Sequence, residues 1–151
     1  VIDLLLSAGA DIDAPSDEGF TPLHWASYRR DCDDLTAILL RYGANKDAVM
    51  DDDDWSPLHM AAEHGNVAAT RALLAAGADV TLRVDGVADI TNSALDVAAL
   101  FGQVEVIREF VRHGVDLDAY CFNTDCTALD NAAWKNHVGA IDALIEAGAS
   151  I

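Results

Sequence analysis

A pair of apolar residues followed three positions later by glycine recurs five times in this chain, and it constrains the fold more than any other feature. Successive glycines are spaced 34, 34, 37 and 34 residues apart. A second mark recurs with the same period: Ser or Thr, then Pro or Ala, then Leu, then His or Asp. Two independent marks with one period indicate repeated structural units. The glycines are Gly9, Gly43, Gly77, Gly114 and Gly148, and the second mark begins at Thr21, Ser56, Ser93 and Thr127.

Each unit is predicted to contain two short helices. The Ser or Thr is suited to cap the first helix, and Pro22 and Pro57 then stand at its first position, where no N–H is needed. A second helix with apolar residues at helical spacing, such as Val67, Leu73 and Leu74, runs to the glycine, which ends it in the left-handed conformation. Helices this short are marginal alone, so we expect the units to stack.

The segments TPLHWA at 21–26, SPLHMAAEHG at 56–65 and LLAAGAD at 73–79 resemble the ankyrin repeat. The resemblance covers the whole chain and implies an all-α solenoid of helix-turn-helix units with β-hairpin loops. We expect a single ankyrin-repeat domain over 1–151, divided into a partial repeat at 1–15 and repeats at about 16–50, 51–87, 88–121 and 122–151.

Two departures from the repeat predict local differences. Segment 77–93 spans 16 positions where segment 9–21 spans 12, and within it Asp85 and Gly86 stand between two valines. Asp-Gly between β-branched residues is typical of a type I′ turn, so we expect one hairpin to turn there and to project beyond the others. The segment from Thr21 to Gly43 is one residue longer than the equivalent segment from Ser56 to Gly77, which predicts a bulged helix junction at 30–33.

His24 and His59 occupy equivalent positions, three residues after the cap. The repeat predicts a structural role for both, as partners of the capping residue and of neighbouring backbone. Asp96 and Asp130 replace them in the later repeats, which keeps an acceptor near the cap and loses the imidazole donor.

The charge balance excludes some partners. Asp and Glu number 26 against 9 Lys and Arg, giving a formal charge of −17 and a pI near 4.2. Such a surface repels nucleic-acid phosphates and anionic membranes. The apolar run 72–78 is much shorter than the roughly 20 residues that cross a bilayer. The sequence therefore predicts no nucleic-acid or membrane partner.

The three cysteines do not have the spacing of a disulfide framework, which indicates a reducing compartment, the cytoplasm or the nucleus. Cys121 and Cys126 with His113 or His137 would supply three metal ligands, but the sequence places no fourth.

A calcium loop beginning at Asp51 would need Gly at its sixth position and Glu at its twelfth, where the chain has Ser56 and Ala62. There is no GxSxG, P-loop or GxGxxG motif. The sequence therefore predicts no enzyme, no cofactor and no metal site.

The ankyrin resemblance implies a binding site on a concave face formed by hairpin tips and first helices. Five of the positions there are aromatic, which suits a protein partner with a basic and apolar segment. The positions are Asp17, Glu18, Phe20, Tyr28, Arg29, Asp52, Asp53, Trp55, Glu63, His64, Asp89, Ile90, Asn92, Leu100, Phe101, Asn123, Thr124, Cys126, Trp134 and Lys135.

Two other functions remain open, an assembly module whose repeats stack on further repeats and a regulatory domain of a larger enzyme. The chain opens within a helix whose partner helix is missing, and the apolar residues of 138–145 resemble an internal helix more than a polar cap. We therefore expect this chain to be a piece of a longer protein. We also expect copies of it to self-associate end to end.

Overall fold

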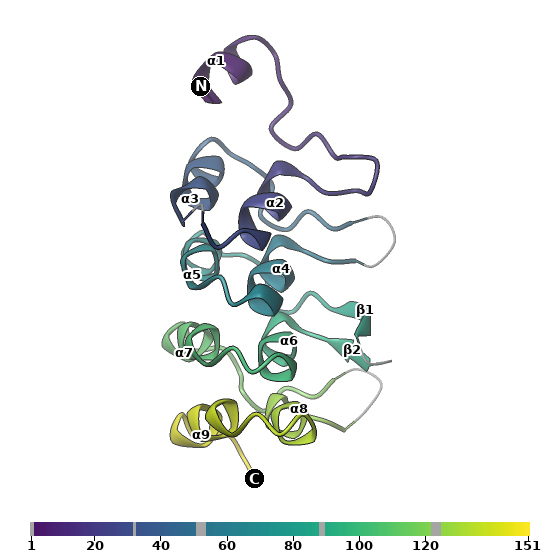
Figure 1. Ribbon diagram of the computed structural model, residues 1–151, viewed down its shortest axis with the longest axis vertical. Coiled ribbons are helices and arrows are strands. Elements are labelled where there is room, and N and C mark those ends of the chain that lie inside the picture. Colours follow the sequence, from purple (N-terminus) through teal and green to yellow (C-terminus); the bar gives the residue numbers. More distant parts are fainter. Residues whose placement is uncertain (1, 32, 51–53, 88–89, 122–124) are drawn as a thin grey trace.

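The computed structural model describes residues 2–31, 33–50, 54–87, 90–121 and 125–151. Its helices form two parallel columns, and the connecting loops extend to one side (Figure 1). The N- and C-termini lie at opposite ends of the stack. This arrangement confirms the expected helical solenoid, because each unit packs mainly on the unit before it and the unit after it.

The column nearer the loops contains the first helix of each unit. Thr21, Ser93 and Thr127 cap three of these helices by accepting a hydrogen bond from the backbone N–H three residues later. Small residues such as Ala26, Ala61 and Ala98 are fully buried and let adjacent helices approach closely. The first helices are α2 (Pro22–Tyr28), α4 (Pro57–His64), α6 (Ala94–Leu100) and α8 (Ala128–Trp134).

The other column contains the second helices, and the glycine after each has a positive φ of 68° to 97°. This geometry confirms that these glycines end the helices in a conformation that other residues rarely adopt. The hydrophobic core lies between the columns, where Leu73, Phe110 and Leu144 are fully buried. The second helices are α1 (Ile2–Ser7), α3 (Asp33–Arg41), α5 (Val67–Ala75), α7 (Val104–Arg112) and α9 (Val138–Glu146).

Polar side chains at the helix junctions connect successive units. Asn66 Nδ2 donates to the carbonyl oxygens of Ser27 at 3.1 Å and Arg29 at 2.7 Å. At the next two junctions, Gln103 donates to the carbonyl of Glu63 at 2.7 Å, and His137 to that of Leu100 at 3.0 Å. These bonds satisfy carbonyl groups at the C-terminal end of the preceding first helix.

Aspartates in the loops form a second set of connections between units. Asp13 accepts from the backbone N–H of Asn45 at 2.8 Å, and Asp118 from that of Ser150 at 2.7 Å. Each bond joins residues 32 apart. Thr81 stands where the series would place another aspartate, and it bonds instead to Asp79 within its own loop.

The expected hairpin is present, but its turn is displaced. Strand β1 (Val84–Val87) pairs with β2 (Ile90–Asn92) in antiparallel fashion, with Val87 opposite Ile90. The prediction of a turn at Asp85 and Gly86 is therefore wrong. These residues lie inside β1, where the register shifts by one residue, and glycine commonly occupies such bulges. The tip of the hairpin lies outside the described residues, so its expected projection stays a prediction.

The junction between α2 and α3 differs from the others, as the additional residue predicts. A residue with positive φ follows each of the other three first helices. These residues are Gly65 after α4 at 68°, Gly102 after α6 at 65° and Asn136 after α8 at 58°. Arg29 follows α2 in extended backbone instead, with φ −87° and ψ 124°. Position 32 of this junction lies outside the described residues.

Candidate functional site

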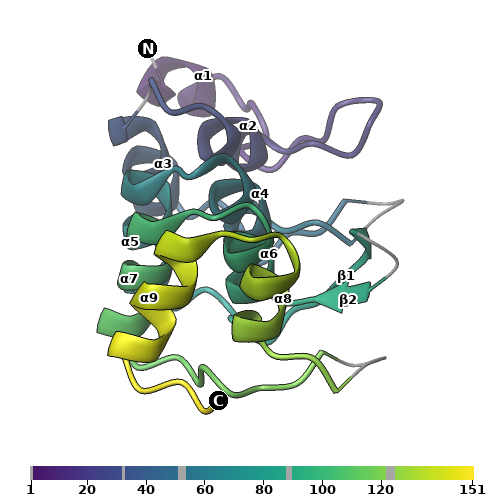
Figure 2. The same ribbon diagram turned by 60° about the horizontal axis from the view of Figure 1, so that its bottom comes forward.

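We call the surface formed by the first helices and the adjoining loops the hairpin face, because all positions predicted to bind a partner derive from these segments. Figure 2 shows that the loops leave the stack on one side, away from the second helices. The two sides of the molecule are thus built from different segments, and they can be tested separately.

Aromatic rings form a continuous run over the first two full units. Phe20 stacks on Trp25 with ring centroids 4.8 Å apart, and Trp25 meets Tyr28 edge-on at 6.0 Å. Tyr28 then lies 4.3 Å from His64, which belongs to the next unit. Tyr28 and Trp25 are 43% and 45% exposed, so a large part of each ring remains open to a partner. Three of these four residues are predicted site residues, and the structure brings them together.

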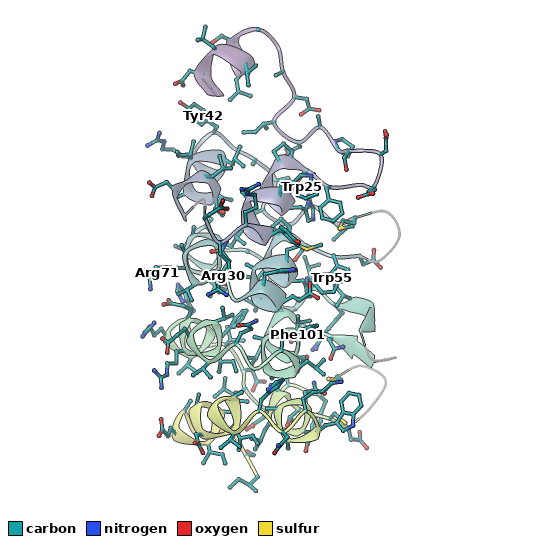
Figure 3. The ribbon with its side chains drawn as sticks, viewed as in Figure 1. Trp25, Arg30, Tyr42, Trp55, Arg71 and Phe101 are labelled. Carbon is teal, nitrogen blue, oxygen red and sulfur yellow. The ribbon has the colours of Figure 1, made fainter. Side chains whose placement is uncertain are left out.

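Trp25 is the residue that the sequence prediction missed. It follows His24 in the TPLHWA segment, at a position where the repeat leads us to expect a core residue. The equivalent residues Met60, Val97 and Asn131 are all buried. Figure 3 shows Trp25 beside α2, the first helix nearest the N-terminal end. A tryptophan in the first full unit, with no first helix expected before it, is the signal that could have revealed this exposure.

Trp55 combines a structural role with partial exposure. Its ring packs against the hydrophobic core and meets His59 edge-on at 6.0 Å. Its carbonyl oxygen accepts a hydrogen bond from His24 Nε2 at 2.9 Å. His24 Nδ1 in turn accepts from the backbone N–H of Thr21, so His24 joins its own cap to the next unit. His24 therefore has the predicted structural role.

The two later units present a different surface. Phe101 and Trp134 are 43% and 60% exposed, and Lys135 Nζ lies 4.2 Å from the centre of the Trp134 ring. Leu100 and Asn92 are buried, so their side chains are not available to a partner. Cys126 is half-buried. The aromatic surface is therefore richest around α2 and resumes at the ends of α6 and α8.

The charged positions surround the aromatic run. Asp17 and Glu18 are exposed in the first loop, and Glu63 Oε2 lies 3.3 Å from His64 Nδ1. Arg29 forms a two-pronged, exposed ion pair with Asp31 at 2.7 Å and 3.0 Å. Five of the remaining predicted positions lie outside the described residues: Asp52, Asp53, Asp89, Asn123 and Thr124. The backbone of Ile90 is described, but its side chain is not.

A buried polar cluster anchors the base of the hairpin to α6. Asp96 accepts from the backbone N–H and the hydroxyl of Ser93 at 2.9 Å and 2.7 Å, and it pairs with Arg83 at 3.1 Å. Burial raises the pKa of Asp96, while the Ser93 hydrogen bonds and the Arg83 charge oppose that rise. Asp96 thus keeps the acceptor role predicted when it replaced histidine, and it adds an ion pair.

Two further buried groups lie beside this cluster. Burial, reinforced by the charge of Asp96, raises the pKa of the Cys121 thiol to about 11, which leaves it a poor nucleophile. Burial lowers the pKa of His59 to about 4. Its Nδ1 accepts from Ser56, and its Nε2 lies near the carbonyls of Leu82 and Asn92 without a partner in hydrogen-bond geometry among the described residues. His59 is therefore a neutral, structural histidine.

Within the described ranges, no group of three or more His, Cys, Asp or Glu side chains is arranged to hold a metal. The same part of the chain contains no helix that is long and apolar enough to span a membrane.

Comparison with known proteins agrees with this geometry. A sequence profile described as ankyrin repeats (three copies) matches residues 1–84. The chain belongs to the ankyrin repeat family. A second profile, ankyrin repeats (many copies), matches residues 95–145. Ankyrin repeats generally mediate contacts between proteins, and the repeats themselves are not catalytic.

Several longer ankyrin proteins are similar to this chain. Palmitoyltransferase Hip14 of Drosophila melanogaster is 40% identical over 81 residues, which cover 52% of this chain and 12% of that protein. Ankyrin repeat protein nuc-2 of Neurospora crassa is 32% identical over 151 residues, 99% of this chain and 14% of that protein. Ankyrin repeat and KH domain-containing protein mask-1 of Caenorhabditis elegans is 29% identical over 178 residues, 100% of this chain and 7% of that protein. The chain thus spans a small part of these relatives.

Proposed function

We propose that this ankyrin domain is a non-enzymatic scaffold that binds a protein partner on the hairpin face. The observation that supports this most is the run from Phe20 through Trp25 and Tyr28 to His64, which leaves two large rings nearly half exposed. Exposed aromatic rings held rigidly by neighbours are typical anchors of protein interfaces. A fully solvated face would be expected to carry polar side chains at these positions.

The partner is a protein segment that combines apolar and basic side chains. Asp17 and Glu18 flank the aromatic run, and the whole chain has a formal charge of −17. Such a field attracts cationic segments and repels nucleic acid and anionic lipid. The cysteine pattern, which indicates a reducing compartment, supports a location in the cytoplasm or the nucleus.

A regulatory domain of a larger enzyme is the second candidate function. It is favoured by the similarity to repeats of palmitoyltransferase Hip14 and of palmitoyltransferase AKR1 of Candida albicans, which is 40% identical over 74 residues. In that case the hairpin face would hold either the substrate protein or the catalytic domain.

The proposal is tested by affinity capture from a lysate with quantitative mass spectrometry, comparing wild type with Tyr28→Ala and Trp134→Ala. Both side chains are at least 43% exposed, so we expect both variants to fold. We expect one set of proteins to be lost from both variants and kept by Val138→Ala, a control that trims a 59% exposed side chain on the second helix α9. Equal capture by all four proteins would contradict binding on this face.

A further inference from the structure

Glu109 of α7 is a buried carboxylate at a position where the other repeats have apolar residues. Five positions before the glycine that ends the helix, α3, α5 and α9 have Ile38, Ala72 and Ala143. Glu109 is only 2% exposed, and burying a carboxylate costs free energy that its ion pairs must offset. Because apolar side chains fill the same place in the other units, stacking of the repeats does not require this carboxylate.

Two arginines from neighbouring units pair with this carboxylate. Arg71 of α5 and Arg112 of α7 donate to the same oxygen, Glu109 Oε1, at 2.6 Å and 2.5 Å. The hydrogen bond from Arg71, together with the charges of both arginines, holds the pKa of Glu109 below its ordinary value, although burial opposes this. The arginine side chains remain 62% and 57% exposed. One buried anion therefore holds two guanidinium groups side by side at the surface.

Arg30 adds a third guanidinium group. Arg30 and Arg71 line a pocket of about 320 Å³, together with the uncharged residues 65–68. None of these described lining residues has a carboxylate, although Asp and Glu number 26 against 9 Lys and Arg in the chain. Figure 3 shows both arginines at the level of α5. Within the described ranges, Arg30 has no ion pair, so its charge is available to a ligand.

We call Arg30, Arg71 and Arg112 the arginine cluster. With Glu109, the cluster has a combined formal charge of +2. The nearby carboxylate of Glu105 is already paired with Arg108 at 3.0 Å, and that of Asp31 with Arg29 at 2.7 Å. Glu146 lies farther along the surface, where it lines a separate groove between α7 and α9. The cluster is therefore a local excess of positive charge on an acidic chain.

We propose that the pocket between Arg30 and Arg71 binds a phosphorylated serine or threonine side chain of a protein partner. A phosphate monoester has a charge of about −1.5 to −2 at pH 7, which matches the charge of the cluster. Guanidinium groups bind phosphate oxygens through parallel hydrogen bonds, and clustered arginines recur in the recognition of phosphorylated segments. In this site Glu109 and Arg112 hold Arg71 in position, which explains a carboxylate that the repeat does not require.

The charge of the whole chain favours a single phosphoryl group over a long polyanion. A nucleic acid or an anionic membrane would extend beyond the cluster and meet the carboxylates of a chain whose formal charge is −17. At about 0.15 M salt, exposed charges are largely screened beyond about 8 Å, so one phosphoryl group in the pocket interacts mainly with the cluster. The inference does not depend on the hairpin face, which is built from other segments.

NMR of the full chain with ¹⁵N-labelled arginine side chains tests the proposal. The probe is a degenerate peptide library with one fixed phosphoserine, compared at about 0.15 M NaCl with the same library containing serine and with inorganic phosphate. We expect the phosphorylated library to shift the Nε–H signals of Arg30 and Arg71 most and that of Arg112 less. Its dissociation constant should be at least about tenfold lower than that of either comparison.

Variants assign the binding to the cluster. Arg30→Gln and Arg71→Gln should each weaken binding about tenfold or more. Arg71→Lys keeps the charge but loses the planar fork, so it should also bind more weakly than wild type. Arg41→Gln removes an exposed arginine from α3 outside the cluster, and this matched control should bind like wild type. Because Arg30 has no ion pair in the described structure, Arg30→Gln should fold normally even if Arg71→Gln is less stable, and thermal unfolding checks both.

The other outcomes overturn the proposal. Equal affinity for inorganic phosphate would indicate an adventitious ion only, and equal affinity for the serine library would show that the phosphoryl group is not recognised. Equal weakening by Arg41→Gln would indicate a general effect of charge. A ribo-oligonucleotide that shifts the same signals with the same or higher affinity would assign the cluster to nucleic acid instead. No shift of the Arg30 and Arg71 signals would contradict the site itself.

Discussion

Asp47 Oδ1 accepts a hydrogen bond from the backbone N–H of Asp79 at 2.7 Å, which ties one loop to the loop of the following unit. The same bond recurs at Asp13 and Asp118, so it belongs to the repeat rather than to one site. A carboxylate bound to a backbone N–H is a charge-assisted bond, and its loss leaves a donor without its partner.

We therefore expect Asp47→Ala to lower the free energy of unfolding by about 1 kcal/mol, the low end of the range because the loop is exposed. Asp47→Asn keeps an acceptor and should cost less than half as much. Urea denaturation of both variants measures this difference. Equal losses in the two variants would indicate that charge, rather than the bond to Asp79, stabilises the loop.

Asp96 and Asp130 make the same cap but differ in burial, which predicts different costs on truncation. Asp130 is exposed, and among the described residues its carboxylate accepts from Thr127 alone, at 2.8 Å and 3.0 Å. Asp96 is 2% exposed, and its removal would leave Ser93 and Arg83 without their carboxylate. We expect Asp96→Ala to cost about 3 kcal/mol or more and Asp130→Ala about 1 kcal/mol.

Chemical denaturation of the two variants measures these costs side by side. Similar values for Asp96→Ala and Asp130→Ala would show that the cap alone matters and that the buried ion pair with Arg83 adds nothing.

His59 predicts a loss of stability in mild acid. Burial lowers its pKa in the folded protein to about 4, below the ordinary value of 6.5. The unfolded chain therefore binds a proton first, so the stabilisation is complete above pH 6.5 and is lost as the pH falls toward about 4. Between about pH 7 and pH 5, this one group should remove about 2 kcal/mol from the free energy of unfolding.

His59→Gln removes the titrating group and is the matched variant for this measurement. Its stability should fall less than that of wild type between the same two pH values, in urea denaturation at each pH. The range stays above that in which most carboxylates titrate. Identical pH dependence in wild type and variant would show that His59 is not the group responsible.

The caps, the glycine helix ends and the structural role of His24 could be predicted from sequence because each depends on residues within one unit or on the period itself. The turn at Asp85 and Gly86 was predicted wrongly, since a local turn signal does not fix strand register, and register depends on pairing across the hairpin. Trp25 was missed because the burial of its position depends on packing between units, and the described residues place no first helix on that side of α2.

Substitutions of the acidic residues and of the aromatic residues on the hairpin face should change the binding kinetics of a captured partner in different ways. Asp17→Asn with Glu18→Gln should slow association and flatten its dependence on salt, because these groups act through a screened field. Tyr28→Ala or Trp134→Ala should speed dissociation, at a cost of about 2 kcal/mol if the ring is a central anchor. Surface plasmon resonance at two salt concentrations separates the two rates. Faster dissociation in the acidic variants with unchanged association would contradict the steering role.

Hydrogen–deuterium exchange of the complex tests the central claim most directly, because it compares the two sides of the molecule in one experiment. With the captured partner bound, we expect slower exchange in 16–28, 54–64 and the C-terminal turns of α6 and α8, where the exposed rings lie. Exchange in the second helices α3, α5, α7 and α9 should be unchanged or slowed much less. Protection concentrated on those second helices, with the segments around Trp25 and Tyr28 unaffected, would contradict binding on the hairpin face.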